Sequence, residues 1–170
     1  MSILGSQKPI VLVGPMGVGK TTIGKKLAKT LRLPFADSDQ LISEQHGPIP
    51  EIFEELGEAK FRDIEEEIVL GQLGSPKILA TGGGAVLSSR VREALSVAFV
   101  VYLSTDGRHM SSRLATGKRP LLKNGISDWR TIYESRRHLY EEVADFTLDT
   151  SRNGLKDNVE AIVERVSKDD

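Results

Sequence analysis

Short apolar runs alternate along this chain with longer segments in which apolar residues recur every three or four positions. Short runs rich in β-branched residues predict strands, and the longer spacing predicts amphipathic helices. Because helical segments separate consecutive strands, we expect a three-layer α/β fold with a parallel sheet between two layers of helices. The predicted strands are residues 9–13, 32–37, 77–81, 97–103 and 146–149.

The helical segments carry start and stop signals of their own. The first predicted helix has an apolar face that ends at Leu31, and Gly57 is suited to end a later one. Ser88 or Ser89 is suited to cap a helix, as is Ser127, because a serine hydroxyl accepts a hydrogen bond from a free amide at a helix start. The later predicted helices are 40–45, 50–56, 61–73, 88–95, 127–143 and 155–166.

Residues 14–21 read GPMGVGKT and match the pattern G-x-x-x-x-G-K-[ST]. In this pattern backbone N–H groups surround a phosphate, the lysine reaches the terminal phosphates, and the hydroxyl of the last residue binds Mg²⁺. The predicted strand 9–13 precedes the glycine-rich segment and a predicted helix follows it. That order places a helix N-terminus against the phosphate. The sequence therefore predicts a nucleoside triphosphate site.

The second predicted strand runs into Asp37-Ser38-Asp39. Ligands of parallel sheets bind at the carboxyl ends of the strands, so these carboxylates should lie beside the glycine-rich loop. A spacing of two places both on the same face of an extended segment. One would then hold Mg²⁺, directly or through water, and the other would orient an attacking hydroxyl and accept its proton. The alternative is a polar turn that caps the next helix.

Two other segments are compatible with substrate binding. The third predicted strand ends in Thr81-Gly82-Gly83-Gly84-Ala85, in which three glycines allow a substrate to approach bare backbone, although a tight connection would also use one or two. Residues 117–125 read GKRPLLKNG, a basic segment without helical or strand periodicity. This segment is either a solvated loop or a lid that excludes water and brings positive charge to a phosphate.

Arg62 and Arg136 each share a predicted helix stripe with apolar residues. An arginine near buried surface usually has an anionic partner. Glu65 is one such partner for Arg62, in a purely structural pair; the alternative is that both arginines hold a substrate carboxylate. Their spacing does not decide between the two. The acidic run 65–67 is predicted to be mostly a solvated helix face, and the three histidines show no metal-ligand spacing and should have surface or packing roles: His46, His109 and His138.

Composition restricts the class of protein. The 23 basic and 24 acidic residues give a net charge of -1, which predicts no nucleic-acid or acidic-membrane partner. Cysteine is absent, so disulfides and thiolate sites are excluded. The N-terminus does not resemble a signal peptide and no apolar stretch approaches the length of a membrane span. We expect one domain over residues 1–170, soluble and cytoplasmic.

Taken in order, these segments resemble the shikimate kinase family over nearly the whole chain. The matching pieces are GPMGVGKTTIG, DSD, GEAKFRDIEEEIV, ATGGGAV, RPLL, RHLYEEVADFTLDT and SRN. The resemblance implies transfer of the γ-phosphate of ATP to the 3-hydroxyl of shikimate by a monomer. It also implies a five-stranded sheet of order 2-3-1-4-5 related to nucleoside monophosphate kinases. A shikimate-binding segment would lie at about 37–65 and a mobile lid at about 110–125.

The resemblance implies roles for individual residues as well. Lys20, Asp39 and Arg119 would be catalytic, and Mg²⁺ would be held by Thr21 and, through water, by Asp37. Many relatives carry Ser at the position of Thr21, a change that keeps the hydroxyl. The residues implied to bind ATP are Gly17, Val18, Gly19, Lys20, Thr21, Thr22, Arg113, Arg119, Arg152 and Asn153. The residues implied to bind shikimate are Asp39, Arg62, Gly82, Gly83, Gly84 and Arg136.

Three other functions are compatible with a glycine-rich phosphate loop. A kinase for another polyol acid, such as gluconate, would not need the pairing of F-R-x-x-E with three glycines. A nucleoside monophosphate kinase would phosphorylate AMP or CMP. A nucleotide-binding regulatory module without activity would have lost Lys20, Asp39 or Arg119, and all three are present. A switch GTPase is disfavoured because the chain lacks an N-K-x-D motif.

Overall fold

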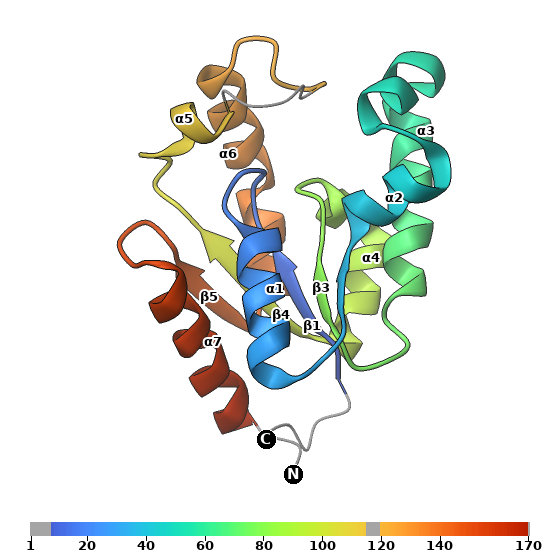
Figure 1. Ribbon diagram of the computed structural model, residues 1–170. Helices are drawn as coiled ribbons and strands as arrows, with labels where there is room; N and C mark the ends of the chain where they lie inside the picture. Colours follow the sequence, from blue (N-terminus) through green and yellow to red (C-terminus); the bar gives the residue numbers. More distant parts are fainter. Residues whose placement is uncertain (1–7, 115–119, 170) are drawn as a thin grey trace.

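The computed structural model describes residues 8–114 and 120–169, and its centre is a five-stranded parallel sheet. The strand order is β2-β3-β1-β4-β5, which confirms the order that the family resemblance implies. Each strand pairs in parallel with its neighbours, so all the carboxyl ends lie along one edge, at the top of Figure 1. The strands are β1 (Ile10–Val13), β2 (Phe35–Asp37), β3 (Ile78–Ala80), β4 (Phe99–Ser104) and β5 (Phe146–Asp149).

Helices cover both faces of this sheet (Figure 1). Side chains of β1 alternate between the two faces: Ile10 and Leu12 pack towards α1 and α7, and Val11 and Val13 pack towards α3, α4 and α6. All four are buried, as expected for a central parallel strand. The α-helices are α1 (Lys20–Leu31), α2 (Ser38–His46), α3 (Ile49–Gly71), α4 (Ser89–Ala94), α5 (Met110–Leu114), α6 (Ile126–Val143) and α7 (Leu155–Asp169).

The second strand is shorter than predicted, and this changes the placement of the aspartates. β2 begins at Phe35 because Arg32 ends α1 in the left-handed region, with a φ of 57°, and donates its N–H to Ala28. β2 ends at Asp37, whose carboxylate caps α2 by accepting from the amides of Asp39 and Gln40. The prediction that both aspartates lie in one extended segment was therefore wrong: Asp39 lies in the first turn of a helix.

Other helix boundaries differ in smaller ways. The two helices predicted at 50–56 and 61–73 form one element, α3, with a kink at Gly57, where φ is 83°. Ser88 caps α4 as predicted, accepting from the amide of Val91. Ser127 does not cap α6, because that helix begins earlier, after Gly125. The short helix α5 was not predicted. Among the residues that the structure describes, no helix is both long enough and apolar enough to span a bilayer.

Candidate active site

Two adjoining cavities lie at the carboxyl edge of the sheet. The larger has a volume of about 650 Å³ and the smaller about 180 Å³. Four residues line both cavities: Met16, Asp39, Gly82 and Gly83. Residues of the predicted ATP site that line the larger cavity are Gly17, Val18, Gly19, Lys20, Thr21, Thr22, Arg113 and Asn153. Residues of the predicted substrate site that line the smaller cavity are Asp39, Arg62, Gly82, Gly83, Gly84 and Arg136.

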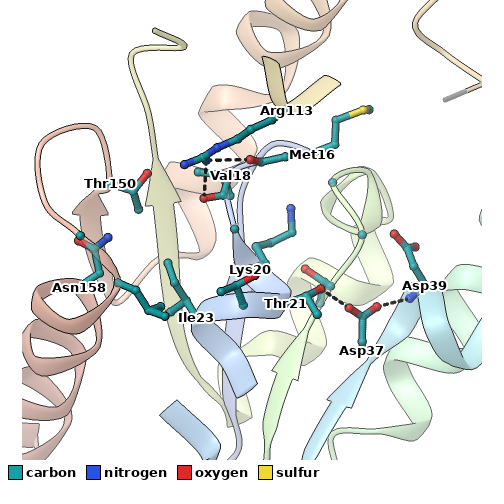
Figure 2. Close-up of a pocket in the computed structure, with 18 of the residues that line it drawn as sticks. Met16, Val18, Lys20, Thr21, Ile23, Asp37, Asp39, Arg113, Thr150 and Asn158 are labelled. Carbon is teal, nitrogen blue, oxygen red and sulfur yellow. Dashed lines mark hydrogen bonds between the residues drawn. The ribbon is translucent and has the colours of Figure 1, made fainter. Parts of the chain in front are cut away.

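The glycine-rich loop between β1 and α1 forms one wall of the larger cavity (Figure 2). Gly17 and Gly19 have φ values of 80° and 108°, which side-chain-bearing residues rarely adopt. Lys20 is buried, and its Nζ donates to the carbonyls of Gly14 and Pro15 at 2.6 and 2.9 Å. A cationic side chain, backbone amides and the N-terminus of α1 therefore converge here, which suits a polyphosphate.

Thr21 and Asp37 place hard oxygen ligands beside this loop. The Thr21 hydroxyl donates to Oδ2 of Asp37, and Oδ1 of Asp37 accepts from the amide of Asp39 at 2.9 Å (Figure 2). Within residues 8–114 and 120–169 no group of three or more histidine or acidic side chains is placed to hold a metal ion. Mg²⁺ does not need one, because it is usually bound by one or two carboxylates together with substrate phosphates and water. The donor set here fits that ion.

Asp39 lies against the glycine loop that follows β3. A Cβ atom built on Gly82 would lie 2.6 Å from Oδ1 of Asp39 and 2.8 Å from Oε2 of Glu65, so only glycine admits both carboxylates. The neighbouring Ser38 is fully buried and its Oγ accepts from the amide of Gly82 at 3.0 Å. Ser38 thus fastens the start of α2 to the glycine loop. Its position between two aspartates was the only signal in the sequence for this role.

Both predicted arginines face the smaller cavity. Arg62 donates from Nη1 to Oε1 of Glu65 at 2.7 Å, and its guanidinium lies where a Cβ atom of Gly84 would be. Arg136 is only 6% exposed, and its Nη1 lies 3.6 Å from the position of a Cβ atom on Gly83. Arg62 therefore has its structural partner and also lines a cavity, so the two interpretations of this residue are compatible.

Glu65 corrects the expectation of a solvated acidic face. It is 3% exposed because Phe61, Glu65 and Val69 form one buried stripe of α3, whereas Glu67 is exposed. Burial raises the pKa of Glu65, and the charge of Arg62 and its hydrogen bond oppose that rise. The carboxylate is therefore held at a site where it is poorly solvated and paired with one cation. As predicted, His46, His109 and His138 are exposed.

The remaining wall of the smaller cavity is apolar and was not predicted. The rings of Phe53 and Phe61 lie 4.7 Å apart between their centroids. The volume of about 180 Å³ is less than a third of that of the neighbouring cavity, which suits a small organic molecule better than a nucleotide. The apolar lining residues are Ile49, Pro50, Phe53, Phe61, Pro120 and Leu121.

Two segments border the far side of the larger cavity. Arg113 donates from Nη1 to the carbonyls of Gly17 and Val18 at 3.0 and 3.4 Å. Thr150 and Asn153 line the cavity from the loop before α7, whereas Arg152 is exposed and is not among the lining residues. Arg119 lies outside the described residues. The structure therefore brings together most of the predicted ATP-site residues but not Arg152.

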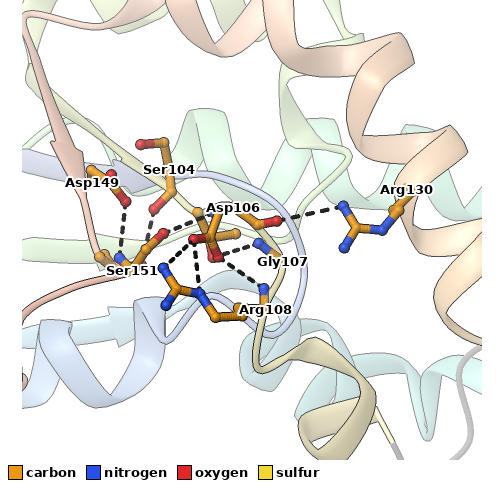
Figure 3. A network of polar contacts seen from close by, with 9 residues as sticks. Ser104, Asp106, Gly107, Arg108, Arg130, Asp149 and Ser151 are labelled. Carbon is orange, nitrogen blue, oxygen red and sulfur yellow. Dashed lines mark hydrogen bonds and ion pairs between the residues drawn. The ribbon is translucent and has the colours of Figure 1, made fainter.

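Hydrogen bonds fix the loop before α7 to the end of β4, as Figure 3 shows. Oγ of Ser151 accepts from the amide of Asp106 at 2.8 Å, and the amide of Ser151 donates to Asp149 at 2.9 Å. Asp106 in turn accepts from the guanidinium of Arg108 at 2.8 Å. This network holds the position of the loop that carries Thr150 and Asn153. The SRN segment was recognised in the sequence, but the hydrogen bonds that hold it to the end of β4 were not predicted.

Comparison with known proteins identifies this arrangement. The family model described as "Shikimate kinase" matches residues 16–167. A shikimate kinase of Streptomyces coelicolor is 42% identical, with 92% of this chain and 94% of that protein covered. A shikimate kinase of Mannheimia succiniciproducens is 40% identical, with 96% and 97% covered. The structure of Acinetobacter baumannii shikimate kinase in complex with shikimate superimposes with a TM-score of 0.88 at 37% identity, with 96% of this chain and 94% of that one covered. The chain belongs to the shikimate kinase family.

Proposed function

We propose that this protein transfers the γ-phosphate of ATP to the 3-hydroxyl of shikimate, giving shikimate 3-phosphate and ADP. The observation that carries the proposal is the position of Asp39, which lines both cavities. A phosphoryl transfer between two bound molecules needs them in adjoining sites with the acceptor hydroxyl at the junction. Asp39 lies at that junction, beside the glycine loop common to both cavities.

ATP would occupy the larger cavity. The loop amides and Lys20 would bind its phosphates, and Arg113 and Asn153 would border the nucleoside. Thr21 and Asp37 would hold Mg²⁺, which when bound supplies positive charge to the phosphate oxygens. Arg119 would add charge on the transferring group from its own segment, as an arginine does in other phosphoryl-transfer enzymes.

Shikimate would occupy the smaller cavity. Arg62 and Arg136 would bind its carboxylate, and the apolar wall would contact its ring. Asp39 would hold the 3-hydroxyl in line with the phosphate and accept its proton as oxygen attacks phosphorus. The bond from phosphorus to the bridging oxygen of ADP breaks as the new one forms, and ADP leaves. Positioning and charge would account for most of the rate.

A panel of acceptors tests this proposal. ADP release from ATP and Mg²⁺ is measured with shikimate, gluconate or AMP, and with no acceptor, and the product is analysed by ³¹P NMR. We expect ADP to form with shikimate, with the phosphate on the 3-hydroxyl. ADP release with gluconate or AMP at an equal or higher rate would assign the smaller cavity to another substrate. Release at the same rate with no acceptor would contradict transfer to a second bound molecule.

The proposed partners are the two small molecules only, with the chain acting as a monomer in the cytoplasm. Apart from Arg119, the residues assigned above all line the two cavities, so the proposal calls on no side chain of a second subunit. A net charge of -1 gives no general attraction to nucleic acid. A single species at the monomer mass in light scattering, active at that concentration, is the expected result.

A further inference from the structure

A buried tyrosine lies behind the glycine loop, outside both cavities. Tyr140 is 1% exposed and lies one turn after Arg136 on α6. Its hydroxyl donates to the carbonyl of Gly83 at 2.5 Å. Burial raises its pKa to about 12, although the charge of Arg136 and a hydrogen bond with that side chain oppose the rise. The phenol therefore stays protonated at neutral pH, and its O–H donates a hydrogen bond to the carbonyl of Gly83.

Gly83, which accepts from this hydroxyl, and Arg136, whose charge acts on it, both line the smaller cavity. In a trans peptide the C=O and the following N–H point in opposite directions, so fixing the carbonyl of Gly83 also fixes the amide of Gly84. Gly84 in turn packs on the guanidinium of Arg62. One hydroxyl thus holds the Gly83–Gly84 peptide, on which the guanidinium groups of both Arg136 and Arg62 pack. These are the two cations assigned to the substrate carboxylate.

We propose that Tyr140 is a positioning residue for the carboxylate of shikimate, acting through Arg136 and the Gly83–Gly84 peptide. This inference rests on the proposed function. The guanidinium of Arg136 must meet a carboxylate in one plane to form two parallel hydrogen bonds, so a small rotation weakens the contact. The Tyr140 hydroxyl, by donating to Gly83, fixes the backbone on which this guanidinium packs and so limits that rotation.

Packing alone does not require this hydroxyl. The ring of Tyr140 stacks on that of Tyr102 at 5.3 Å between centroids and lies 6.2 Å from that of Tyr133. Tyr102 offers a matched comparison, because it is 2% exposed and its hydroxyl is also hydrogen-bonded, at 2.6 Å to that of Tyr133. Tyr102 lines neither cavity. Removing either hydroxyl keeps the aromatic cluster, but only one removal affects the glycine loop.

The test compares Tyr140→Phe with Tyr102→Phe in steady-state assays well below the melting temperature of each variant. For Tyr140→Phe we expect the KM for shikimate to rise by about tenfold, as for the loss of a hydrogen bond that orients a charged group. The KM for ATP should stay within about twofold, because the glycine-rich phosphate loop is untouched. Tyr102→Phe should leave both KM values unchanged while lowering the melting temperature comparably. A KM for shikimate that is unchanged in Tyr140→Phe, or raised equally in Tyr102→Phe, would overturn the proposal.

A double-mutant cycle with Arg136→Lys tests whether Tyr140 acts through Arg136. Lysine cannot reproduce the planar pair of donors, so Tyr140→Phe should raise the KM for shikimate far less in that background than in the wild type. Equal effects in both backgrounds would contradict a route through Arg136. Assays of the wild-type enzyme separate the two proposals. If the wild type does not phosphorylate shikimate, the proposed function fails. If it does, and Tyr140→Phe has an unchanged KM for shikimate, only the role of Tyr140 is overturned.

Discussion

Glu65 and the two arginines of the smaller cavity form a cluster of charges with little access to water. Glu65 is buried and pairs with Arg62 at 2.7 Å, and Arg136 is also buried. Removing one member of such a cluster leaves the others unpaired, which usually costs more than the pair itself contributes. The cluster therefore has separate consequences for stability and for substrate affinity.

The pKa of Glu65 makes stability depend on pH. Burial raises this pKa above its ordinary value of 4.5. Between pH 4.5 and the raised pKa, the folded protein therefore keeps a proton that the unfolded chain has released. The free energy of unfolding contributed by this group is therefore largest below pH 4.5 and is lost as pH rises through the raised pKa. We expect the free energy of unfolding of the wild type, minus that of Glu65→Gln, to fall over this range. Urea denaturation of both proteins at several pH values measures it, and a difference that rises with pH would contradict the assignment.

The arginines should govern substrate affinity. Arg62→Ala or Arg136→Ala removes a charged hydrogen-bond donor to the carboxylate, a loss of about 1.5–3 kcal/mol, so the KM for shikimate should rise about ten- to a hundredfold. Arg137→Ala is the matched control, since Arg137 pairs with Glu134 at 2.9 Å and lines neither cavity. Steady-state kinetics with shikimate as the varied substrate provide the measurement. An unchanged KM for shikimate in both variants would contradict a contact between these two arginines and the carboxylate of shikimate.

At the scale of elements, the turn from β2 into α2 and the glycine loop after β3 define the junction of the cavities. Asp37 ends the strand and caps the helix, which points Asp39 at the glycine loop. The two segments are joined by the hydrogen bond from the Gly82 amide to Ser38. The position of Asp39 therefore depends on the absence of a side chain at residue 82.

Gly82→Ala should impair turnover more than folding. The added Cβ would lie 2.6 Å from Oδ1 of Asp39 and 2.8 Å from Oε2 of Glu65, so one or both carboxylates must move. A displacement of about 1 Å at a reacting group lowers turnover on the order of 10²-fold. The matched control is Gly71→Ala at the end of α3, where an added Cβ has no neighbour within 4 Å. Measured kcat and melting temperatures separate the effects; a kcat for Gly82→Ala equal to that of Gly71→Ala would contradict this placement of Asp39.

Local patterns predicted most elements but not every boundary. Strand periodicity located all five strands, and the glycine-rich loop located the start of α1. β2 was predicted three residues too early, at 32, because the left-handed Arg32 has no sequence signature. Glu65 was predicted to be solvated because three acidic residues in a row suggest a polar face. Its spacing of four from both Phe61 and Val69 was the signal that it lies on the buried stripe.

At the scale of the whole molecule, parallel topology brings distant segments to one edge. In the sheet, β1 lies between β3 and β4, and β2 lies on the other side of β3. The loops after β1, β2 and β3 are therefore neighbours. Helical spacing alone left open whether Arg62 and Arg136 share a site, since no local pattern relates α3 to α6. In the folded chain both arginines line one cavity. α6 also contacts the glycine-rich phosphate loop, because the indole N–H of Trp129 donates to the carbonyl of Met16 at 2.9 Å. The site is therefore a property of the sheet order and not of any one segment.

The central claim is that Asp39 acts on an acceptor hydroxyl where the two cavities meet. The most direct measurement compares ligand binding and turnover in Asp39→Asn, which keeps the size of the side chain and removes its basicity. By calorimetry, the dissociation constants for ATP and for shikimate should change by less than about tenfold. Turnover should fall on the order of 10²-fold or more, as for loss of a general base. Turnover close to that of the wild type, with both ligands bound, would contradict the account.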